Sequence, residues 1–181
     1  MIRVKRLIIQ CKALYNLIGL CLKQNKSELF FMRRSKMKIA MASDHGGFAL
    51  KAELKAYLES KGYEIVDLGT DSADSTDYPK WGKECSEYVV SGNAEKGIVL
   101  CGTGIGISIA ANKVKGARCA LVTSEEAAKM AAEHNQANLL SLGGRTTSVA
   151  EAKKYVDIWL STPPDLAERH VKRVGMLNEM G

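Results

Sequence analysis

The sequence lacks the cysteine patterns that are typical of metal sites and of disulfide frameworks. Its five cysteines form no C-x-x-C pair, and none lies near a histidine at the spacing that zinc sites use. There is also no serine-nucleophile elbow and no lysine in a setting that suits a Schiff base. These absences argue against zinc, disulfide-stapled and serine-hydrolase classes. Unpaired cysteines of this kind suit a reducing cytoplasm, where we expect the protein to be located.

The sequence has no apolar run long enough for a clear membrane span. Its most apolar stretch, RLIIQCKALYNLIGLCLK, is interrupted by Lys12 and is not followed by a signal-peptide cleavage site. Residues 1–36 hold nine basic residues and one acidic residue, a net charge of +8, so residues 37–181 carry 17 basic and 19 acidic residues, or −2. The basic character therefore belongs to the N-terminal segment, and the rest of the chain shows no charge signal for nucleic-acid binding.

We interpret residues 1–36 as a basic N-terminal extension that is poorly ordered, most simply the product of a start site placed upstream of Met37. A transit peptide and a helical membrane tether are the alternatives for this segment. Residues 37–181 then form one domain, which is long enough to bury a core of its own.

From Met37 onward, continuous apolar runs alternate with segments of helical periodicity. The predicted strands are 38–43, 63–69, 97–102, 117–122 and 137–144, and the predicted helices are 48–62, 80–92, 105–114, 124–135, 148–161 and 165–180. Apolar strands that alternate with helices predict an α/β fold with a parallel sheet covered on both faces. We expect a Rossmann-like three-layer αβα sandwich with a five-stranded parallel sheet.

Three loops follow predicted strands and are rich in glycine or polar residues: SDHGG, CGTGIG and GGRT. In sheets of this kind ligands bind at the carboxyl ends of the strands, so these loops predict the site. The CGTGIG loop spells G-x-G-x-G, with Ile107 where a dinucleotide fingerprint needs its last glycine, and it does not follow the first strand. Nucleotide binding is therefore disfavoured, and what remains is a set of backbone N–H groups that suits a developing oxyanion.

Cys101 opens this loop and is a candidate catalytic group. A cysteine at a strand end is usually a small buried apolar residue, and this interpretation suits Cys119 and Cys85. Cys101 differs from both because the adjacent helix N-terminus would stabilise its thiolate.

The histidines and arginines supply further candidates. His134, followed by Asn135 at a helix end, is a candidate for acid–base chemistry, whereas a structural and a functional role are about equally plausible for His170. Arg169 and Arg173 are four residues apart and share a helical face, which is either a solvated basic face or a phosphate clamp. Arg145 would be a third member of that clamp. The set predicts proton transfer on a small phosphorylated substrate without a cofactor or metal.

Seven motifs then carry a family resemblance over essentially all of residues 37–181. In chain order they are SDHGGFALK, VDLGT, TDYP, GIVLCGTGIGISIAANKV, EHNQAN, LSLGGR and RHVKRV. Together they resemble type B ribose-5-phosphate isomerase, in the wider group that includes the galactose-6-phosphate isomerase subunits. The resemblance implies the αβα sandwich, assembled as a homodimer or a tetramer of dimers with an active site shared between subunits, and an aldose–ketose isomerase acting through an enediolate.

The same resemblance implies roles for individual residues. Cys101 would be the base that moves a proton between C1 and C2, assisted by Thr103, and His134 would open the sugar ring. The groups implied to hold the sugar and the enediolate are Asp44, His45, Gly102, Thr103, Gly104, Ile105, Gly106 and Asn135. The groups implied to address the phosphate are Arg145, Arg169 and Arg173.

Two departures from the family pattern affect the choice of sugar. Gln136 stands where an aspartate is common, and Glu168 places a negative charge beside Arg169. The leading substrate pair is ribose 5-phosphate and ribulose 5-phosphate, and a six-carbon phosphosugar such as allose 6-phosphate or galactose 6-phosphate is the alternative. A non-catalytic phosphosugar-binding or flavodoxin-like module is the third hypothesis, but binding alone has no need of a thiol base.

Overall fold

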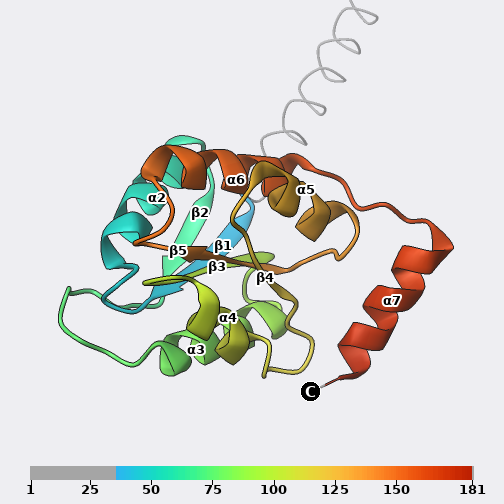
Figure 1. Ribbon diagram of the computed structural model, residues 1–181, viewed down its shortest axis with the longest axis horizontal. Coiled ribbons are helices and arrows are strands. Elements are labelled where there is room, and N and C mark those ends of the chain that lie inside the picture. The colour runs from blue at the N-terminus through green and yellow to red at the C-terminus, as the bar shows by residue number, and fades with distance from the viewer. Residues whose placement is uncertain (1–35, 181) are drawn as a thin grey trace, which may run out of the picture. The chain divides into compact units, whose positions relative to one another are not determined.

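The structure is a computed structural model that describes residues 36–180 (Figure 1). The prediction of a poorly ordered extension over residues 1–36 therefore lies, apart from Lys36, outside the described residues. The strands are β1 (Lys38–Ser43), β2 (Glu64–Asp67), β3 (Lys96–Cys101), β4 (Cys119–Leu121) and β5 (Leu139–Gly143). The helices are α2 (Phe48–Ser60), α3 (Tyr78–Val90), α4 (Ile105–Ala111), α5 (Glu125–Glu133), α6 (Val149–Ser161) and α7 (Glu168–Glu179).

The five strands form one parallel sheet with the order β2-β1-β3-β5-β4. The three central strands are continuously apolar and almost fully buried, as expected for a parallel sheet that is covered on both faces. In the register, Leu139 pairs with Gly97 at the amino end and Gly143 pairs with Cys101 at the carboxyl end. The ends of β1, β3 and β5 therefore meet at one edge.

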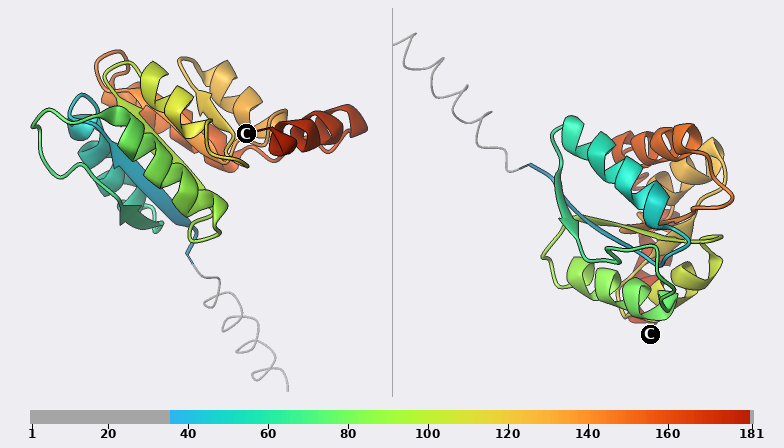
Figure 2. Two further views of the ribbon diagram at one scale, coloured as in Figure 1. Left: turned by 90° about the horizontal axis from the view of Figure 1, so that it is seen from below. Right: turned by 90° about the vertical axis from the view of Figure 1, so that its left-hand side faces the viewer.

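Two apolar layers cover the sheet, and Figure 2 shows helices on both of its faces. On one face α2, α5 and α6 pack through Leu54, Ala128 and Trp159, and the Trp159 indole N–H donates to the Ala137 carbonyl at 3.2 Å. On the other face α3 and α4 pack through residues such as Cys85 and Ile107. The predicted three-layer αβα sandwich with a five-stranded parallel sheet is confirmed.

All eleven predicted elements of residues 37–181 occur in the predicted order, with shifted ends. Helix α3 begins at Tyr78, two residues earlier than predicted, because Pro79 suits the first turn of a helix, where its missing N–H is not needed. Helix α6 begins at Val149, one residue after the predicted start, because Ser148 is its N-cap and forms a capping box with Glu151. Strand β4 is an edge strand of three residues, half the predicted length.

Helix α7 lies beside the body of the domain and packs less deeply than the other helices (Figures 1 and 2). Its buried residues are His170 and Val174. The apolar stripe that the sequence indicates for this segment is otherwise exposed: Leu166 by 70%, Val171 by 48% and Leu177 by 40%. No helix among the described residues is long and apolar enough to cross a membrane.

Candidate active site

The three predicted loops meet at the carboxyl edge of the sheet, after β1, β3 and β5. The Asp44 N–H donates to the Leu100 carbonyl, and the N–H groups of Gly144 and Arg145 donate to the carbonyls of Cys101 and Gly102. This edge includes the point between β1 and β3 where the strand order reverses, which is the usual ligand site of such sheets. We call the candidate residues of these loops (Asp44, His45, Cys101–Gly106 and Arg145) the carboxyl-edge cluster.

Glycines let these loops approach at backbone distance. A Cβ on Gly144 would lie 2.3 Å from the Gly46 oxygen, and a Cβ on Gly46 would lie 2.9 Å from the Gly102 nitrogen. Gly104 has a φ of 78° and a Cβ there would meet Leu121 at 2.6 Å, so this position requires glycine on both counts. The carboxyl-edge cluster is therefore built chiefly from backbone.

Cys101 ends β3 and its sulfur accepts a hydrogen bond from the Gly104 N–H at 3.1 Å. Cys101 is 4% exposed, and α4 begins shortly after it, at Ile105. Cys85 and Cys119 are also buried, but burial raises the pKa of Cys85 to about 12 and that of Cys119 further still. Cys101 differs from both in that its sulfur accepts a backbone N–H at the end of a strand, and its role as a reactive thiolate stays a prediction.

Asp44 and His45 face the same edge from the loop after β1. Asp44 is 6% exposed and its Oδ1 accepts the Gly47 N–H at 3.1 Å. His45 is half-buried, and its Nδ1 accepts the Thr76 N–H at 3.3 Å. This bond places the ring proton of a neutral His45 on Nε2, so the side chain presents a donor beyond its own loop.

Thr103 and Arg145 complete the exposed part of this cluster. The Thr103 hydroxyl accepts the Ile105 N–H at 3.4 Å, and Ile105 is 52% exposed. Arg145 lies over Gly102, because a Cβ on that glycine would be 3.4 Å from Nη1. The remaining predicted contact positions of the loop are Gly102, Gly104, Ile105 and Gly106.

A second group of predicted residues gathers around the C-terminal end of α5. The rings of His134 and His170 stack with centroids 4.3 Å apart and an interplanar angle of 10°. The Asp165 carboxylate lies 3.3 Å from Nε2 of His170, and the Arg169 Nε–H donates to the same nitrogen at 3.1 Å. We call His134, Asp165, Arg169, His170 and Arg173 the amino-edge cluster.

The surroundings of His170 lower its pKa. Burial, the His134 ring, and the guanidiniums of Arg169 and Arg173 lower the pKa of His170, and they outweigh Asp165, which acts in the opposite direction. The Ala167 N–H bond to the Asp165 carboxylate is the main reason that the pKa of this carboxyl is lowered. The surroundings of His170 as a whole therefore disfavour the charged form of its ring, although the Asp165 carboxylate favours it.

The ligand atoms of His134, Asp165 and His170 lie within 4.8 Å of one another, close enough to consider a metal ion within the described part of the chain. Two features disfavour one. The rings are nearly parallel, so their in-plane lone pairs do not converge on one point, and Arg169 already donates to Nε2 of His170. We therefore treat the group as a histidine stack.

The two clusters lie at opposite edges of the sheet. Cys101 is at the carboxyl end of β3, whereas His134 lies between α5 and β5, beside the amino ends of the strands. From Leu139 to Gly143 strand β5 covers four residue steps, about 13 Å at ~3.3 Å per step. Groups that act on neighbouring sugar atoms must lie within hydrogen-bond reach of them, so a single chain does not bring Cys101 and His134 to one substrate.

The remaining predicted residues and the two departures also lie at this amino edge. Asn135 is exposed next to His134. Gln136 has a φ of 47°, and its carbonyl accepts a hydrogen bond from Nη2 of Arg118 at 2.8 Å. Glu168 is exposed in the first turn of α7, where a negative charge suits the helix dipole.

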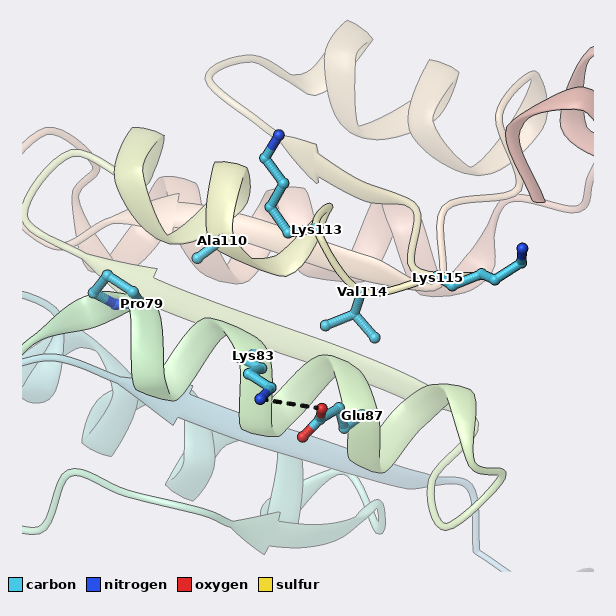
Figure 3. A pocket seen from close by; sticks show the side chains of 7 residues that line it. All are labelled: Pro79, Lys83, Glu87, Ala110, Lys113, Val114 and Lys115. Atoms are coloured by element: carbon cyan, nitrogen blue, oxygen red, sulfur yellow. Dashed lines mark ion pairs between the residues drawn. The ribbon is translucent and has the colours of Figure 1, made fainter. Parts of the chain in front are cut away.

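Figure 3 shows a groove of about 530 Å³ between α3 and the end of α4, away from both clusters. It is lined by Pro79, Lys83, Glu87, Ala110, Lys113, Val114 and Lys115. A second hollow of about 460 Å³ is lined by Asp67, Leu68, Gly69, Asp71 and Trp81. None of the predicted site residues lines either hollow.

Sequence reasoning missed three contributors to these clusters. Asp165 anchors the approach to α7, since its N–H donates to the Glu133 carbonyl at 2.7 Å. Thr76 sets the His45 tautomer, and the buried Ser141 hydroxyl donates to the Gly104 carbonyl at 2.7 Å. Only Asp165 had a local signal, because an aspartate after two prolines and shortly before a helical segment is typical of a turn.

Comparison with known proteins gives a consistent class. The profile of the family described as Ribose/Galactose Isomerase matches residues 39–177. The chain belongs to this family of sugar-phosphate isomerases, as the sequence motifs predict.

Individual relatives within this family are similar to the chain over most of its length. A solved Clostridium thermocellum ribose-5-phosphate isomerase B is 48% identical with a TM-score of 0.77, over 79% of this chain and 96% of that one. The Mycoplasma genitalium ribose-5-phosphate isomerase B, solved with bound ribulose-5-phosphate, is 38% identical with a TM-score of 0.74, over 78% and 94%. The galactose-6-phosphate isomerase subunit LacB of Clostridium acetobutylicum is 43% identical over 68% of this chain and 72% of its own.

Proposed function

We propose that this protein interconverts D-ribose 5-phosphate and D-ribulose 5-phosphate through an enediolate, without a cofactor. The observation that carries the proposal is the Cys101 sulfur beneath the Gly104 N–H, in a glycine loop at the switch point of the sheet. The 48% identity to a solved isomerase of this name supports the substrate pair. The bound ribulose-5-phosphate of the Mycoplasma genitalium enzyme supports it from the ligand side.

In this mechanism the Cys101 thiolate takes the proton from C2 of the open-chain aldose and returns it to C1. The proton of the C2 hydroxyl moves to O1 as the C2 carbonyl forms. A thiolate is a weak base toward a carbon acid, so the enediolate charge has to be stabilised as it develops. The Gly104 N–H, which donates to the sulfur, and the Thr103 hydroxyl of the same loop would serve this task, and such donors contribute ~3–4 kcal/mol each in comparable sites.

Ring opening precedes this step. The C1–O4 bond breaks, the ring oxygen takes a proton from the His134 imidazolium, and the O1 hydroxyl loses its proton to solvent as C1 becomes an aldehyde. Asp44, His45 and Asn135 would bind the sugar hydroxyls. Guanidinium groups are suited to the phosphate through bidentate hydrogen bonds, and the candidates are Arg145, Arg169 and Arg173.

A homodimer accounts for the opposite positions of the two clusters, and a tetramer of such dimers is the larger form. If two copies place the carboxyl edge of one against the amino edge of the other, each site obtains its thiol from one copy and its imidazole from its partner. Exposed apolar side chains next to both clusters support this arrangement: Ile105 and Ile109 on α4, and Val171 and Leu177 on α7. The site would be incomplete without the partner.

The first test is conversion of ribose 5-phosphate to ribulose 5-phosphate by the full chain in the presence of EDTA. We expect metal-independent turnover that collapses in Cys101→Ser. Allose 6-phosphate and galactose 6-phosphate, assayed in parallel, address the six-carbon alternative that the 43% identity to LacB supports. A higher kcat/KM on a six-carbon sugar phosphate would mean that this sugar, and not ribose 5-phosphate, is the substrate. No turnover of any of these sugar phosphates would refute the proposal.

The shared site has its own test. Cys101→Ser and His134→Gln should each be inactive, but chains of the two variants, mixed in equal amounts and allowed to exchange, form heterodimers with one intact site. Random pairing gives about half heterodimers and therefore about one quarter of wild-type activity per chain. Activity that stays at the level of the separate variants, with exchange shown by mass spectrometry of labelled chains, would mean that the site is not shared.

A further inference from the structure

We propose that His170 is a positioning residue: by stacking on His134, it holds that imidazole in the orientation that ring opening needs. The inference rests on the function proposed above, and it assigns a role to the histidine whose purpose the sequence left open between packing and function.

The His134 ring is held by the stack. His134 is half-buried at the end of α5, where its backbone N–H donates to the Met130 carbonyl. Among the described residues, no hydrogen bond holds its imidazole. The face-to-face contact with His170, at 4.3 Å and 10°, is the contact that the structure shows for this ring. Rotation of the His134 ring out of this plane would break it.

His170 is itself firmly placed, which a positioning residue requires. Its side chain is 7% exposed, and its Nε2 accepts the Arg169 Nε–H at 3.1 Å. The segment before α7 is tied to the end of α5, because the Asp165 N–H donates to the Glu133 carbonyl at 2.7 Å. Glu133 immediately precedes His134, so the two stacked rings belong to segments that are joined next to the stack.

The charged groups near the stack contact His170 rather than His134. Arg169 donates to Nε2 of His170, Asp165 lies 3.3 Å from the same atom, and burial with the nearby guanidiniums lowers the pKa of His170. A neutral ring tolerates an imidazolium on its face, whereas two stacked imidazoliums repel each other. Nε2 of His170 is occupied by the Arg169 donor, whereas no hydrogen bond among the described residues occupies the ring nitrogens of His134.

The test uses the chemical difference between the two substrates. Ribose 5-phosphate is a closed furanose and needs ring opening, whereas ribulose 5-phosphate carries its phosphate on O5 and stays acyclic. In the reverse reaction the enzyme can release open-chain ribose 5-phosphate, which closes without help. With enzyme in excess over substrate, uncatalysed ring opening limits the supply of open-chain aldose, so a fault confined to ring opening slows consumption of the aldose and spares consumption of the ketose. Steady-state kcat/KM cannot make this distinction, because the equilibrium constant fixes its ratio in the two directions.

The variants are His170→Gln, which removes the stacked ring, and His170→Phe, which keeps a ring in its place. With enzyme in excess, we expect His170→Gln to lower the rate constant for consumption of ribose 5-phosphate by about 10- to 100-fold, with little change in that for ribulose 5-phosphate, since a small misplacement of a catalytic group has this effect. His170→Phe should recover most of the loss. Cys101→Ser is the control and should slow both directions together.

A readout independent of turnover is the chemical shift of the His134 ring protons. In the wild type the ring current of His170 should displace them, the displacement should vanish in His170→Gln, and it should persist in His170→Phe. An unchanged shift in a folded His170→Gln would overturn the proposal, and so would equal loss in both directions or a Phe variant no better than Gln. If the wild type converts neither pentose phosphate, the proposed function fails, while the shifts still report whether the stack exists.

Discussion

The two clusters of this protein are built in different ways. The carboxyl-edge cluster is made of loops packed backbone to backbone, where Gly46 and Gly144 leave no room for a Cβ. The amino-edge cluster is made of side chains, with His134 at the end of α5 and His170 on a helix that buries two residues. The carboxyl-edge cluster is fixed by backbone contacts within one chain, whereas the amino-edge cluster depends on α7, whose apolar side chains are largely exposed. In the mechanism proposed above, proton abstraction would use the first cluster and ring opening the second.

The largest expected effect separates a reactive cysteine from a packed one. Cys101→Ser should lower kcat for both pentose phosphates by about 10³-fold or more, because a positioned base contributes ~10²–10⁴-fold. Cys85→Ser is the matched control, since that thiol is equally buried but lies in α3 against the Ala40 carbonyl. Steady-state kinetics decide between them. Retained activity in Cys101→Ser would remove the thiol from the mechanism.

The next effect tests how rigid the carboxyl edge is. Gly144→Ala would place a Cβ 2.3 Å from the Gly46 oxygen and 2.9 Å from the Gly47 Cα, so the loops must separate. We expect kcat to fall by about 100-fold.

The matched control lies on the other half of the molecule. A Cβ on Gly175 in α7 meets nothing within 4 Å, so Gly175→Ala should leave kcat unchanged and raise stability by about 0.5–1 kcal/mol. Equal activity in the two glycine variants would contradict a backbone-built site.

A third effect concerns the support behind the carboxyl edge. The Lys51 ammonium is 2% exposed, and it donates to the Asp67 carboxylate and to the Thr70 carbonyl. Lys51→Met leaves both acceptors without this donor and should cost about 3 kcal/mol of unfolding free energy. Lys83→Met, which breaks the exposed pair with Glu87, should cost less than about 0.5 kcal/mol. Denaturant titration measures both.

The Lys51 effect should also depend on pH. Burial raises the pKa of Asp67, but the Lys51 ammonium, the Gly69 N–H and Lys55 outweigh it and leave that pKa lowered. A carboxyl with a lowered folded pKa stabilises the protein above its unfolded pKa, and this contribution is lost as the pH falls through the folded value. The difference between wild type and Lys51→Met should therefore shrink below about pH 4. A difference that grows there would contradict the pairing.

The smallest effect is a pH dependence at the amino edge. Because the folded pKa of His170 lies below its unfolded value, the unfolded chain binds more protons as the pH falls through this range. Stability should therefore decrease from pH 7.5 to 5.5, and His170→Phe should flatten this decrease. Melting temperatures across the range are the measurement. A steeper decrease in His170→Phe would mean that His170 is charged in the folded protein.

The contrast between the clusters also explains what the sequence could predict. The carboxyl-edge cluster was predictable because strand ends, glycines and Cys101 are adjacent in the sequence and the parallel sheet brings their loops together. All eleven helices and strands of residues 37–181 could be predicted as well, because apolar runs and helical periodicity are also patterns of adjacent residues. The stack was not predictable, because residues 134, 165 and 170 meet only through the docking of α7 on α5. Thr76 reaches His45 through its backbone, so its side chain gave no signal.

The placement of Cys101 and His134 on opposite edges has a consequence for how a duplicated gene could evolve. In the dimer proposed above, if the gene were duplicated, one copy could lose the thiol and the other the imidazole, and a mixed pair of chains would still assemble one complete site. Neither copy could then be lost, although no catalytic ability had been gained. An enzyme encoded by one gene would have become an obligate pair of unlike subunits, through two losses that each spare the other half.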